Sequence, residues 1–465
     1  MRKCAYGRPR WLIVAGVIIC IVAFGLRLLN VLLYLPHFIA HKVFLDSEVY
    51  VQGAELILEG GILEGGAYYM SPFYSYFILL AYASFDQWYM TAIRVLQCLL
   101  GAMTCGFIMG ITRRAFGSRQ ALVAGLMACF YGPLIFFDAM ILPTSAAVFL
   151  ISASVYFLLS ARRGRAFFLS GFFLGLAATA RPNSLLLLPV FVFAAYFLYK
   201  GIRKSPRRLR AVLVLAGILT VIVPVTVRNY LASRDFVLIS SNGGLNFYIG
   251  NNPETQVSFT HVPGISPDPS QQLADARRIA ESFMGRPLKD SEVSAFWFRK
   301  GFSFLLEQPR WASIVYLMKV YSYWHYPEVQ LNVNYYFFQR FMPLFAIPFL
   351  NFHVVGPLSL TGLFFLFKRS RRSLILAALA LTLTASVILF FVTGRFRLSV
   401  IPLLIPFAAG AIVFLFDRIR SRSVRHICPL AVTLLFFGVV LNIPVPKQPQ
   451  HFSYNTLGII YLQDD

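Results

Sequence analysis

The chain has 465 residues, of which 58% are hydrophobic and 13% are charged. No arrangement of water-soluble domains could bury this much apolar surface, so the composition excludes a soluble protein and predicts one that lies in a bilayer. The formal net charge of +23 does not indicate a nucleic-acid partner, because the basic residues form clusters between apolar runs instead of one soluble basic face.

Apolar runs of roughly 17 to 25 residues recur along the chain and are long enough to cross the hydrocarbon layer as helices. The first run lacks the short apolar core and the small-residue cleavage site of a removed signal peptide. We therefore predict an all-α polytopic membrane protein with about 11 transmembrane helices. The predicted spans are 11–35, 89–112, 121–137, 144–160, 167–180, 185–199, 211–227, 349–367, 374–392, 398–416 and 427–441.

Clusters of arginine and lysine separate these spans on one side. They hold 24 of the 42 basic residues, as the positive-inside rule expects of cytoplasmic loops. The clusters are Arg2/Lys3/Arg8/Arg10, Arg113/Arg114/Arg119, Arg162/Arg163/Arg165, 200–210, 368–372 and Arg418/Arg420/Arg422/Arg425. Of the 19 acidic residues, only Asp417 falls in these loops. We therefore predict a multi-pass protein of the inner or plasma membrane, with a cytoplasmic N-terminus and an extracytoplasmic C-terminus.

The segments between the spans divide the chain into four parts. We predict an N-terminal transmembrane module at 1–228, an extracytoplasmic loop domain at 229–341, C-terminal transmembrane helices at 342–445 and an outer tail at 446–465. The loop domain is too long for a plain connection, so we expect a small folded unit or a cover over an active site. In the tail, residues 454–461 fit the opening of a tetratricopeptide helix, which predicts a repeat region after residue 465.

The first outer loop, 36–88, carries the first candidate residues for chemistry. Its run 72–85 is too short and too interrupted to cross the membrane, so we place it along the interface. Asp46 and Glu48 follow the first span in a chain that has few acids, and we interpret Asp46 as the working residue. A further acid, Asp138, ends an outward span, where it either shares substrate binding or pairs with an arginine.

Metal and cysteine chemistry have weaker support. His37 and His41 are spaced so that they could bind a metal together with the acids, but no further His or Cys completes a closed set. We therefore assign no metal ligands and leave a divalent metal cofactor open. The six cysteines lie in spans or on the inner side and include no Cys-x-x-Cys pair, so none is predicted to be a nucleophile.

Several cations depart from the positive-inside pattern. Arg94, Arg181 and Arg228 stand at outer helix ends, Arg27 lies within the first span, and an Arg395/Arg397 pair flanks an outer turn. Such charges need partners, because they are costly to insert. They could extend toward water or pair with a buried acid such as Asp138. For the Arg395/Arg397 pair we favour an anionic ligand, since guanidinium groups match phosphate in a bidentate fashion.

An aromatic stretch near the end of the loop domain is bracketed by two further charged residues, Lys319 and Glu328. Residues 321–326 of this stretch are Tyr-Ser-Tyr-Trp-His-Tyr. Aromatic residues of this kind form belts at membrane interfaces, and they also form platforms against which a sugar can stack. The sequence leaves both interpretations open.

In combination, these segments resemble the GT-C glycosyltransferases, in the bacterial branch that is similar to the protein O-mannosyltransferases of glycosyltransferase family 39. The resemblance covers nearly the whole chain and depends on the order of its parts and on their common side of the membrane. The parts are Asp46 with Glu48 and Tyr50, residues 71–74, 175–183 and 228–229, residues 242–253 and 319–328, and Arg395-Phe396-Arg397.

The resemblance implies a GT-C fold and an inverting sugar transfer on the outer face from a polyprenyl-phosphate-linked donor to a hydroxyl of a glycan, lipid or protein. It implies that Asp46 is the catalytic base, that Asp138 is the second-loop acid, and that Arg395 and Arg397 hold the lipid phosphate. The other residues implied in the site are Arg94, Arg181 and Arg228 for donor phosphate and Tyr50, Lys319 and Glu328 for substrate.

One departure from the family pattern affects the assignment of the base. Many members of the family place a second acid directly beside the first, whereas Ser47 separates Asp46 from Glu48 here. Which of the two acids acts as the base therefore stays open at this point, and a pairing of both acids with Arg27 or Lys42 is the alternative without catalysis.

Two other classes of protein compete with an enzyme. A polytopic transporter or lipid flippase would hold its key charges near the membrane midplane, often in two related halves. Here the candidate residues gather on the outer side, Arg27 is the deepest, and no matching halves are evident. A scaffold for a repeat domain would leave the outer arginines unexplained. Membrane lipids are the remaining expected partner, and the identities of the sugar and the acceptor stay open.

Overall fold

The computed structural model describes residues 10–161, 163–197, 206–255, 257–259, 261–331, 333–422 and 424–444, together with 454, 457 and 458. These residues are organised in helices, and a single bridge joins Tyr131 to Leu350 within this part of the chain. The predicted all-α fold is therefore confirmed. Most of the tail at 446–465, and with it the predicted tetratricopeptide opening, lies outside the described residues, as do Arg2, Lys3, Arg8, Arg162 and residues 198–205.

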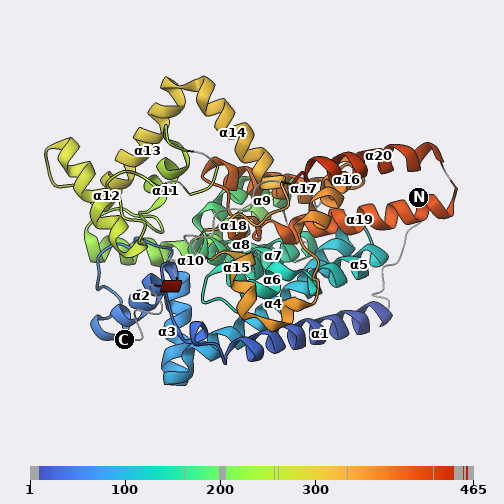
Figure 1. The fold of residues 1–465 in the computed structure, drawn as a ribbon, viewed down its shortest axis with the longest axis horizontal. Coiled ribbons are helices and arrows are strands. Elements are labelled where there is room, and N and C mark those ends of the chain that lie inside the picture. The colour runs from blue at the N-terminus through green and yellow to red at the C-terminus, as the bar shows by residue number, and fades with distance from the viewer. Residues whose placement is uncertain are drawn as a thin grey trace.

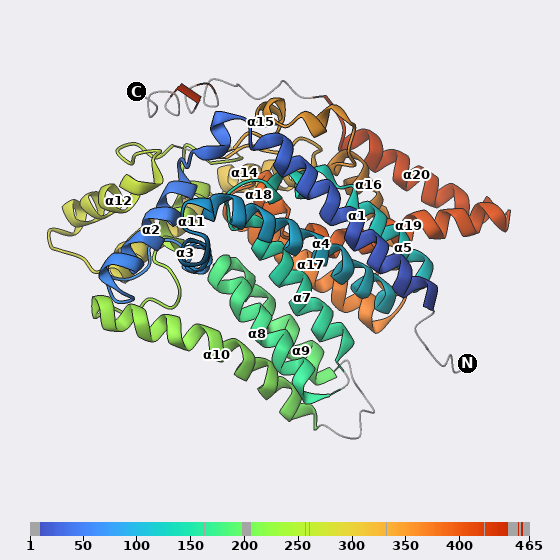
Figure 2. The same cartoon turned by 90° about the horizontal axis from the view of Figure 1, so that it is seen from below.

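Long apolar helices form a bundle in which most axes run in a similar direction (Figures 1 and 2). The bundle helices are α1 (Arg10–Tyr34), α4 (Tyr89–Ala115), α5 (Ser118–Cys129), α6 (Gly132–Asp138), α7 (Thr144–Ser160), α8 (Gly164–Ala180), α9 (Leu188–Phe197), α10 (Arg207–Ser233), α16 (Phe352–Leu366), α17 (Arg371–Leu389), α19 (Ile401–Arg420) and α20 (Val424–Val440). In the described part of the chain, five apolar helical segments are long enough to cross a membrane, and five shorter apolar helices accompany them. The chain is thus a multi-pass membrane protein, as the hydropathy predicts.

Small residues allow the bundle helices to approach closely. A Cβ atom on Gly171 of α8 would overlap the carbonyl of Val214 on α10, and one on Gly217 of α10 would overlap the carbonyl of Phe168 on α8. Lipid tails are as apolar as leucine, so helix association in a membrane depends on such close packing. The pair of glycines therefore fixes how α8 and α10 pack.

Two predicted spans differ from single straight helices. The predicted span 121–137 divides into α5 and α6, because the chain leaves the helix at Phe130 to bond with Leu350, and α6 then starts at Gly132 with Pro133 in its first turn. The predicted span 185–199 begins as a 3₁₀ helix, η3 (Pro182–Leu187), before it continues as α9. Proline lacks the amide hydrogen that a helix interior needs but is tolerated in the first turn, so Pro133 favours a new helix start here.

The polar segments gather at one end of the bundle, where both views place α2, α11 and α12 (Figures 1 and 2). The first outer loop contains η1 (Phe38–His41), α2 (Asp46–Gly60), α3 (Phe73–Phe85) and η2 (Asp86–Trp88). The second polar segment contains α11 (Gly243–Gly250), α12 (Pro269–Met284), α13 (Asp290–Glu307), α14 (Pro309–Trp324), α15 (Tyr335–Phe338), η4 (Gln339–Phe341) and η5 (Pro343–Ala346).

The second polar segment has an apolar core of its own. Leu245 of α11, Ala276 of α12 and Trp297 of α13 are buried in one cluster with Phe391, which follows α17. The indole nitrogen of Trp297 donates to the carbonyl of Ala276 at 3.2 Å, which ties α13 to α12. This segment therefore packs as a unit against the end of the bundle.

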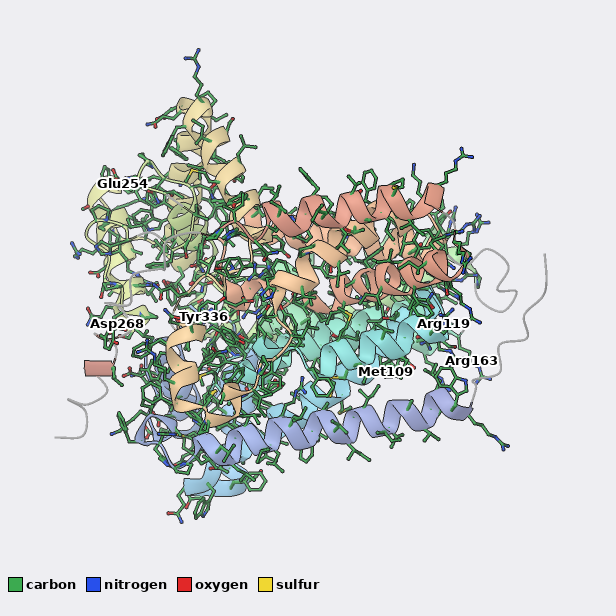
Figure 3. The ribbon with its side chains drawn as sticks, turned by 45° about the vertical axis from the view of Figure 1, so that its right-hand side comes forward. Met109, Arg119, Arg163, Glu254, Asp268 and Tyr336 are labelled. Atoms are coloured by element: carbon green, nitrogen blue, oxygen red, sulfur yellow. The ribbon has the colours of Figure 1, made fainter. Side chains whose placement is uncertain are left out.

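Four charged residues mark the two ends of the molecule. Arg119 and Arg163 lie at one end of the bundle, and Glu254 and Asp268 lie at the opposite end (Figure 3). The distribution agrees with the division of basic and acidic residues between the two sides that the sequence predicts.

Candidate functional site

A cavity of about 510 Å³ lies where α2, the second polar segment and the ends of several bundle helices meet. Charged and polar side chains line part of it, and mostly apolar residues, among them several phenylalanines and prolines, line the rest. The polar residues in its wall are Asp46, Tyr50, Tyr69, Ser71, Arg181, Asn183, Ser240, Asn242, Asn246, Ser258, Gln272, Gln330, Ser386 and Arg395. The cavity thus combines two cations and a carboxylate with a partly apolar wall.

Asp46 enters this cavity from the first turn of α2. A carboxylate in this position is stabilised by the positive end of the helix dipole. The preceding residue, Leu45, has a φ of 53°, a conformation that is costly for a side chain with a Cβ. The hydroxyl of Ser47 donates to the carbonyl of Ile141 at 2.8 Å, so the residue that separates the two acids anchors the start of α2.

Arg395 faces Asp46 from the short helix α18 (Gly394–Arg397). Its Nη2 lies 2.5 Å from Oδ2 of Asp46, and both side chains are only about one-tenth exposed. The amide of Gly394 donates to the carbonyl of Val329 at 2.8 Å, which fixes the backbone beneath Arg395. The structure therefore joins two residues that lie 349 positions apart in the sequence.

Arg181 is the second cation of the cavity. It follows the last residue of α8, and its guanidinium lies 4.7 Å from the centre of the Phe396 ring. The guanidinium of Arg395 lies 5.1 Å from the same ring. Nη2 of Arg181 donates to the Thr144 hydroxyl at 3.1 Å, whereas its Nε is buried without a hydrogen-bond partner. Two arginines that line the cavity thus lie against the same phenylalanine ring.

Arg397 points elsewhere, although the sequence pairs it with Arg395. Its Nη2 lies 3.0 Å from Oε2 of Glu328, and its guanidinium lies 3.8 Å from the centre of the Phe352 ring. It also donates to the carbonyls of Tyr323, His325 and Pro327 at 2.9, 2.6 and 3.0 Å. Residues two apart in a helical turn do not face the same way, so Arg395 and Arg397 cannot share one ligand here.

The same geometry separates the two acids of α2. Glu48 does not line the cavity, and its Oε1 accepts from Nε2 of Gln52 at 3.1 Å. Partial burial raises the pKa of Glu48, and the charge of Asp268 raises it further. Tyr50, four residues after Asp46, does line the cavity, and burial together with the charge of Asp46 raises the pKa of its hydroxyl.

Three other predicted residues lie in the packed interior. Asp138 pairs with Arg27 at 2.7 Å, with side chains that are 3% and 0% exposed. Arg94 donates to the carbonyls of Ala139 and Ala40 at 2.9 and 2.5 Å. None of these residues lines the cavity. The pairing of Asp138 with an arginine, which the sequence left as an alternative, is therefore the arrangement in the structure.

Arg228 holds the first outer loop in place. Its guanidinium donates to the carbonyls of Ile62 and Glu64, each at 2.6 Å, and also to that of Gly66. It lies 3.9 Å from the centre of the Tyr68 ring. This arginine therefore supports the loop that follows α2 and does not line the cavity.

Lys319 connects the second polar segment to the bundle. Its Nζ donates to the carbonyls of Gly250 and Phe390 at 2.5 and 2.7 Å, and it does not line the cavity. Burial lowers the pKa of Lys319 to about 7. Glu328 likewise lies outside the cavity, in its pair with Arg397.

The histidines predicted as alternative metal ligands lie apart from the cavity. His41 bonds the carbonyl of Leu35 at 2.9 Å, and the His37 ring packs edge-on against Phe341. Among the residues that the structure describes, no group of three or more His, Cys, Asp or Glu is placed to hold a metal ion. Because the Asp46 carboxylate accepts from Arg395, the cavity does not offer a set of free anionic ligands.

Sequence reasoning missed several polar residues of the cavity. Gln272 and Gln330 carry no motif, and only the fold of the second polar segment brings them to the site. The Tyr69 hydroxyl is buried without a hydrogen-bond partner, and burial and the nearby charge of Asp46 raise its pKa. The run 242–253, quoted for the family resemblance, did contain a usable signal, because Asn242 and Asn246 both line the cavity.

Comparison with known proteins gives one family and a set of similar folds. Residues 70–227 match the family described as dolichyl-phosphate-mannose-protein mannosyltransferase. The oligosaccharyltransferase of Archaeoglobus fulgidus, solved with Zn and sulfate, has a TM-score of 0.50 and 15% identity over 93% of this chain and 54% of that chain. No curated protein matched the sequence.

Two further solved structures are similar at lower scores. The oligosaccharyltransferase AglB from Archaeoglobus fulgidus, in complex with an inhibitory peptide and a dolichol-phosphate, has a TM-score of 0.47 and 14% identity over 94% of this chain and 56% of that chain. ArnT from Cupriavidus metallidurans, bound to undecaprenyl phosphate, has a TM-score of 0.44 and 14% identity over 98% of this chain and 72% of that chain. The chain spans about half the length of the oligosaccharyltransferases that it matches.

The apolar helices define a polytopic membrane protein, and its fold is similar to that of the Archaeoglobus fulgidus oligosaccharyltransferase. Residues 70–227, which extend from the start of α3 into α10, carry the match to the dolichyl-phosphate-mannose-protein mannosyltransferase family. The match over this part of the chain agrees with the family resemblance seen in the sequence.

Proposed function

We propose that the chain is an integral membrane glycosyltransferase. It transfers a sugar from a polyprenyl-phosphate-linked donor to an acceptor hydroxyl on the extracytoplasmic face, with inversion at the anomeric carbon. The observation that carries the proposal is the convergence of Asp46, Arg181 and Arg395 on one cavity at the end of the molecule that holds Glu254 and Asp268. The family match over residues 70–227 supports a dolichyl-phosphate type of donor.

Asp46 is the proposed general base. Its carboxylate takes the proton from the acceptor hydroxyl while that oxygen forms a bond to the anomeric carbon. The bond between the anomeric carbon and the phosphate oxygen breaks in the same step, and the lipid phosphate leaves with the bonding electrons. Glu48 faces away from the cavity and Asp138 is buried with Arg27, so we do not include them in the reaction.

Arg395 and Arg181 are the proposed phosphate ligands. Guanidinium groups donate in pairs to phosphate oxygens and stabilise the negative charge that grows as the phosphate leaves. This assignment replaces the predicted Arg395/Arg397 pair, because Arg397 lies in a buried pair with Glu328. We also leave Arg94 and Arg228 out of the phosphate site, because the guanidinium group of each donates hydrogen bonds to backbone carbonyls.

The proposed reaction requires the Asp46–Arg395 pair to separate. An inverting displacement places the base and the leaving phosphate on opposite faces of the sugar, so one guanidinium cannot stay bound to the base while it holds the phosphate. The donor phosphate would take Arg395 from Asp46, and the freed carboxylate would then accept the proton. Donor binding and activation of the base are thereby coupled.

The remaining walls suit the other parts of a lipid-linked sugar. Asn242, Asn246 and Gln272 offer hydrogen-bonding groups for sugar hydroxyls, and Tyr50 and Tyr69 offer hydroxyls beside Asp46. Phe259, Phe390 and Phe391 form an apolar side of the same cavity. We assign the sugar to the polar side and the start of the polyprenyl chain to the apolar side.

The extracytoplasmic placement is supported by charge. The acidic residues Glu254 and Asp268 lie at the end of the molecule that holds the second polar segment, and Arg119 and Arg163 lie at the opposite end (Figure 3). By the positive-inside rule, the basic end faces the cytoplasm. The rival proposal of a transporter or flippase predicts key charges near the midplane, whereas the described carboxylate and arginines of the cavity gather at one end.

Cells that lack the protein provide the test. Mass spectrometry of their envelope glycans and glycoproteins should find a product shortened by one sugar, with the lipid-linked donor accumulating. Wild-type protein should restore the product, and Asp46→Asn should not. An unchanged set of covalent products, with lipid-linked sugar retained on the cytoplasmic side, would contradict the transferase and favour the flippase.

A further inference from the structure

A second large cavity shares no lining residue with the proposed active site. It is a groove of about 560 Å³ between α1 and α4, with Tyr156 of α7 in its wall. Arg113 and Arg114 end α4 a few residues before Arg119, which lies at the end of the molecule opposite Asp268 (Figure 3). The neighbours of Asp268, Pro267 and Pro269, line the proposed active site, so the end of the groove at Arg113 is close to the opposite membrane surface.

Small side chains create the groove. Gly16 of α1 and Gly106 of α4 both line it. A Cβ atom on Gly106 would lie 3.3 Å from Sγ of Cys20, and one on Gly16 would lie 3.6 Å from Cε of Met109. A larger side chain at either position would therefore project into the groove or against its wall.

The walls of the groove are apolar and open to the bilayer. Ile13, Val17 and Ile21 on α1 line it and are 47%, 54% and 65% exposed. Leu99 and Met103 on α4 line the other side and are 48% and 42% exposed. These side chains leave an apolar channel along the two helices.

Two arginines close one end of this channel. Arg113 and Arg114, in the last turn of α4, line the groove. Arg114 is held in place, because its Nη1 donates to the carbonyl of Gly110 at 2.8 Å and its guanidinium lies 4.4 Å from the Tyr156 ring. Within the described residues Arg113 has no acidic partner, and Asp417, the acid on this side, pairs with Arg119 at 2.7 Å.

We propose that this groove binds an anionic glycerophospholipid of the inner leaflet. An acyl chain lies in the apolar channel between α1 and α4, and the phosphate head group lies at Arg113 and Arg114. Basic pockets between transmembrane helices on the cytoplasmic side are sites for anionic head groups. The combination of an apolar channel with two cations at its inner end favours a charged lipid over a neutral one.

Native mass spectrometry of the whole protein in nanodiscs tests this proposal. The nanodiscs contain phosphatidylglycerol and phosphatidylcholine with identical acyl chains, and the measurement is the lipid that stays bound after release. Wild-type protein should retain phosphatidylglycerol in preference to phosphatidylcholine. Arg113→Gln should reduce this preference about fivefold, the equivalent of one cationic contact, and Arg113→Lys should keep most of it.

Two variants separate the site from general charge effects. Arg371 and Arg372 are an exposed pair at the start of α17 that does not line the groove, so R371Q/R372Q should leave the preference unchanged. Gly106→Leu fills the channel and should remove retention of both lipids. Equal retention of the two lipids by wild-type protein, or an unchanged preference in Arg113→Gln, would overturn the proposal. A dimer that Gly106→Leu dissociates would instead show that a second copy occupies the groove.

Discussion

Two carboxylate–arginine pairs in this molecule use the same chemistry in different surroundings. Asp46 and Arg395 lie in the wall of a large cavity, with side chains 9% and 11% exposed. Asp138 and Arg27 lie in the packed interior at 3% and 0% exposed, where Gly101 leaves just enough room for them. Arg395 can therefore leave Asp46 for a ligand in the cavity, whereas no ligand can reach Asp138 or Arg27.

The comparison teaches that an acid near the outer end of a membrane helix is not evidence of catalysis by itself. Removing one partner of a buried pair leaves an uncompensated charge, which costs about 3–5 kcal/mol. Removing one partner of a pair beside a cavity leaves a charge that water or substrate can reach. The two pairs should therefore respond to mutation in opposite ways, one in stability and the other in activity.

The largest expected effect on stability comes from Asp138→Ala. This change leaves Arg27 buried without its acid, so the free energy of unfolding should fall by about 3–5 kcal/mol. Thermal melting and unfolding in detergent would measure the loss. Asp138→Asn keeps a hydrogen-bond acceptor for Nε of Arg27 and should lose less. A fully stable Asp138→Ala protein that cannot transfer sugar would show that Asp138 acts in the reaction.

A smaller effect is expected for Arg395→Ala, and it should appear in donor binding. A hydrogen bond to a charged group contributes about 1.5–3 kcal/mol, so affinity for a polyprenyl-phosphate-linked sugar should fall about 10- to 100-fold. Arg395→Lys should restore part of it, because lysine keeps the charge without the planar fork. Binding of labelled donor to purified protein is the measurement.

Arg397→Ala is the matched control for that variant. It removes the buried partner of Glu328, so it should lower thermal stability, and any folded fraction should bind donor normally. The reverse result, a stable Arg397→Ala protein with weak donor binding and a normal Arg395→Ala protein, would return the phosphate site to Arg397.

The smallest effect is expected for Glu48→Gln. Glu48 lies outside the cavity, where it accepts a hydrogen bond from Gln52 and feels the charge of Asp268. Single-turnover transfer should therefore change by no more than about twofold, the size of a surface effect of about 0.5 kcal/mol. A loss comparable to that of Asp46→Asn would instead assign the base to Glu48.

The sequence predicts the membrane helices well because their length and apolarity are local properties, which is why α1, α7 and α19 appear close to their expected positions. It also singles out Asp46, since acids are rare near the spans. It cannot separate Arg395 from Arg397, or Asp46 from Glu48, because each pair lies within one helical turn and only the packing decides which member faces the cavity. Gln272 and Gln330 reach the cavity through tertiary structure alone.

Single-turnover transfer by Asp46→Asn tests the central claim most directly, with donor binding measured on the same protein and folding checked by thermal melting. Asparagine keeps the size of the side chain but cannot accept the acceptor's proton. Transfer should therefore fall about 10² to 10⁴-fold, while the protein stays folded and still binds donor. Near-normal transfer by a folded Asp46→Asn protein would contradict the assignment of Asp46 as the base.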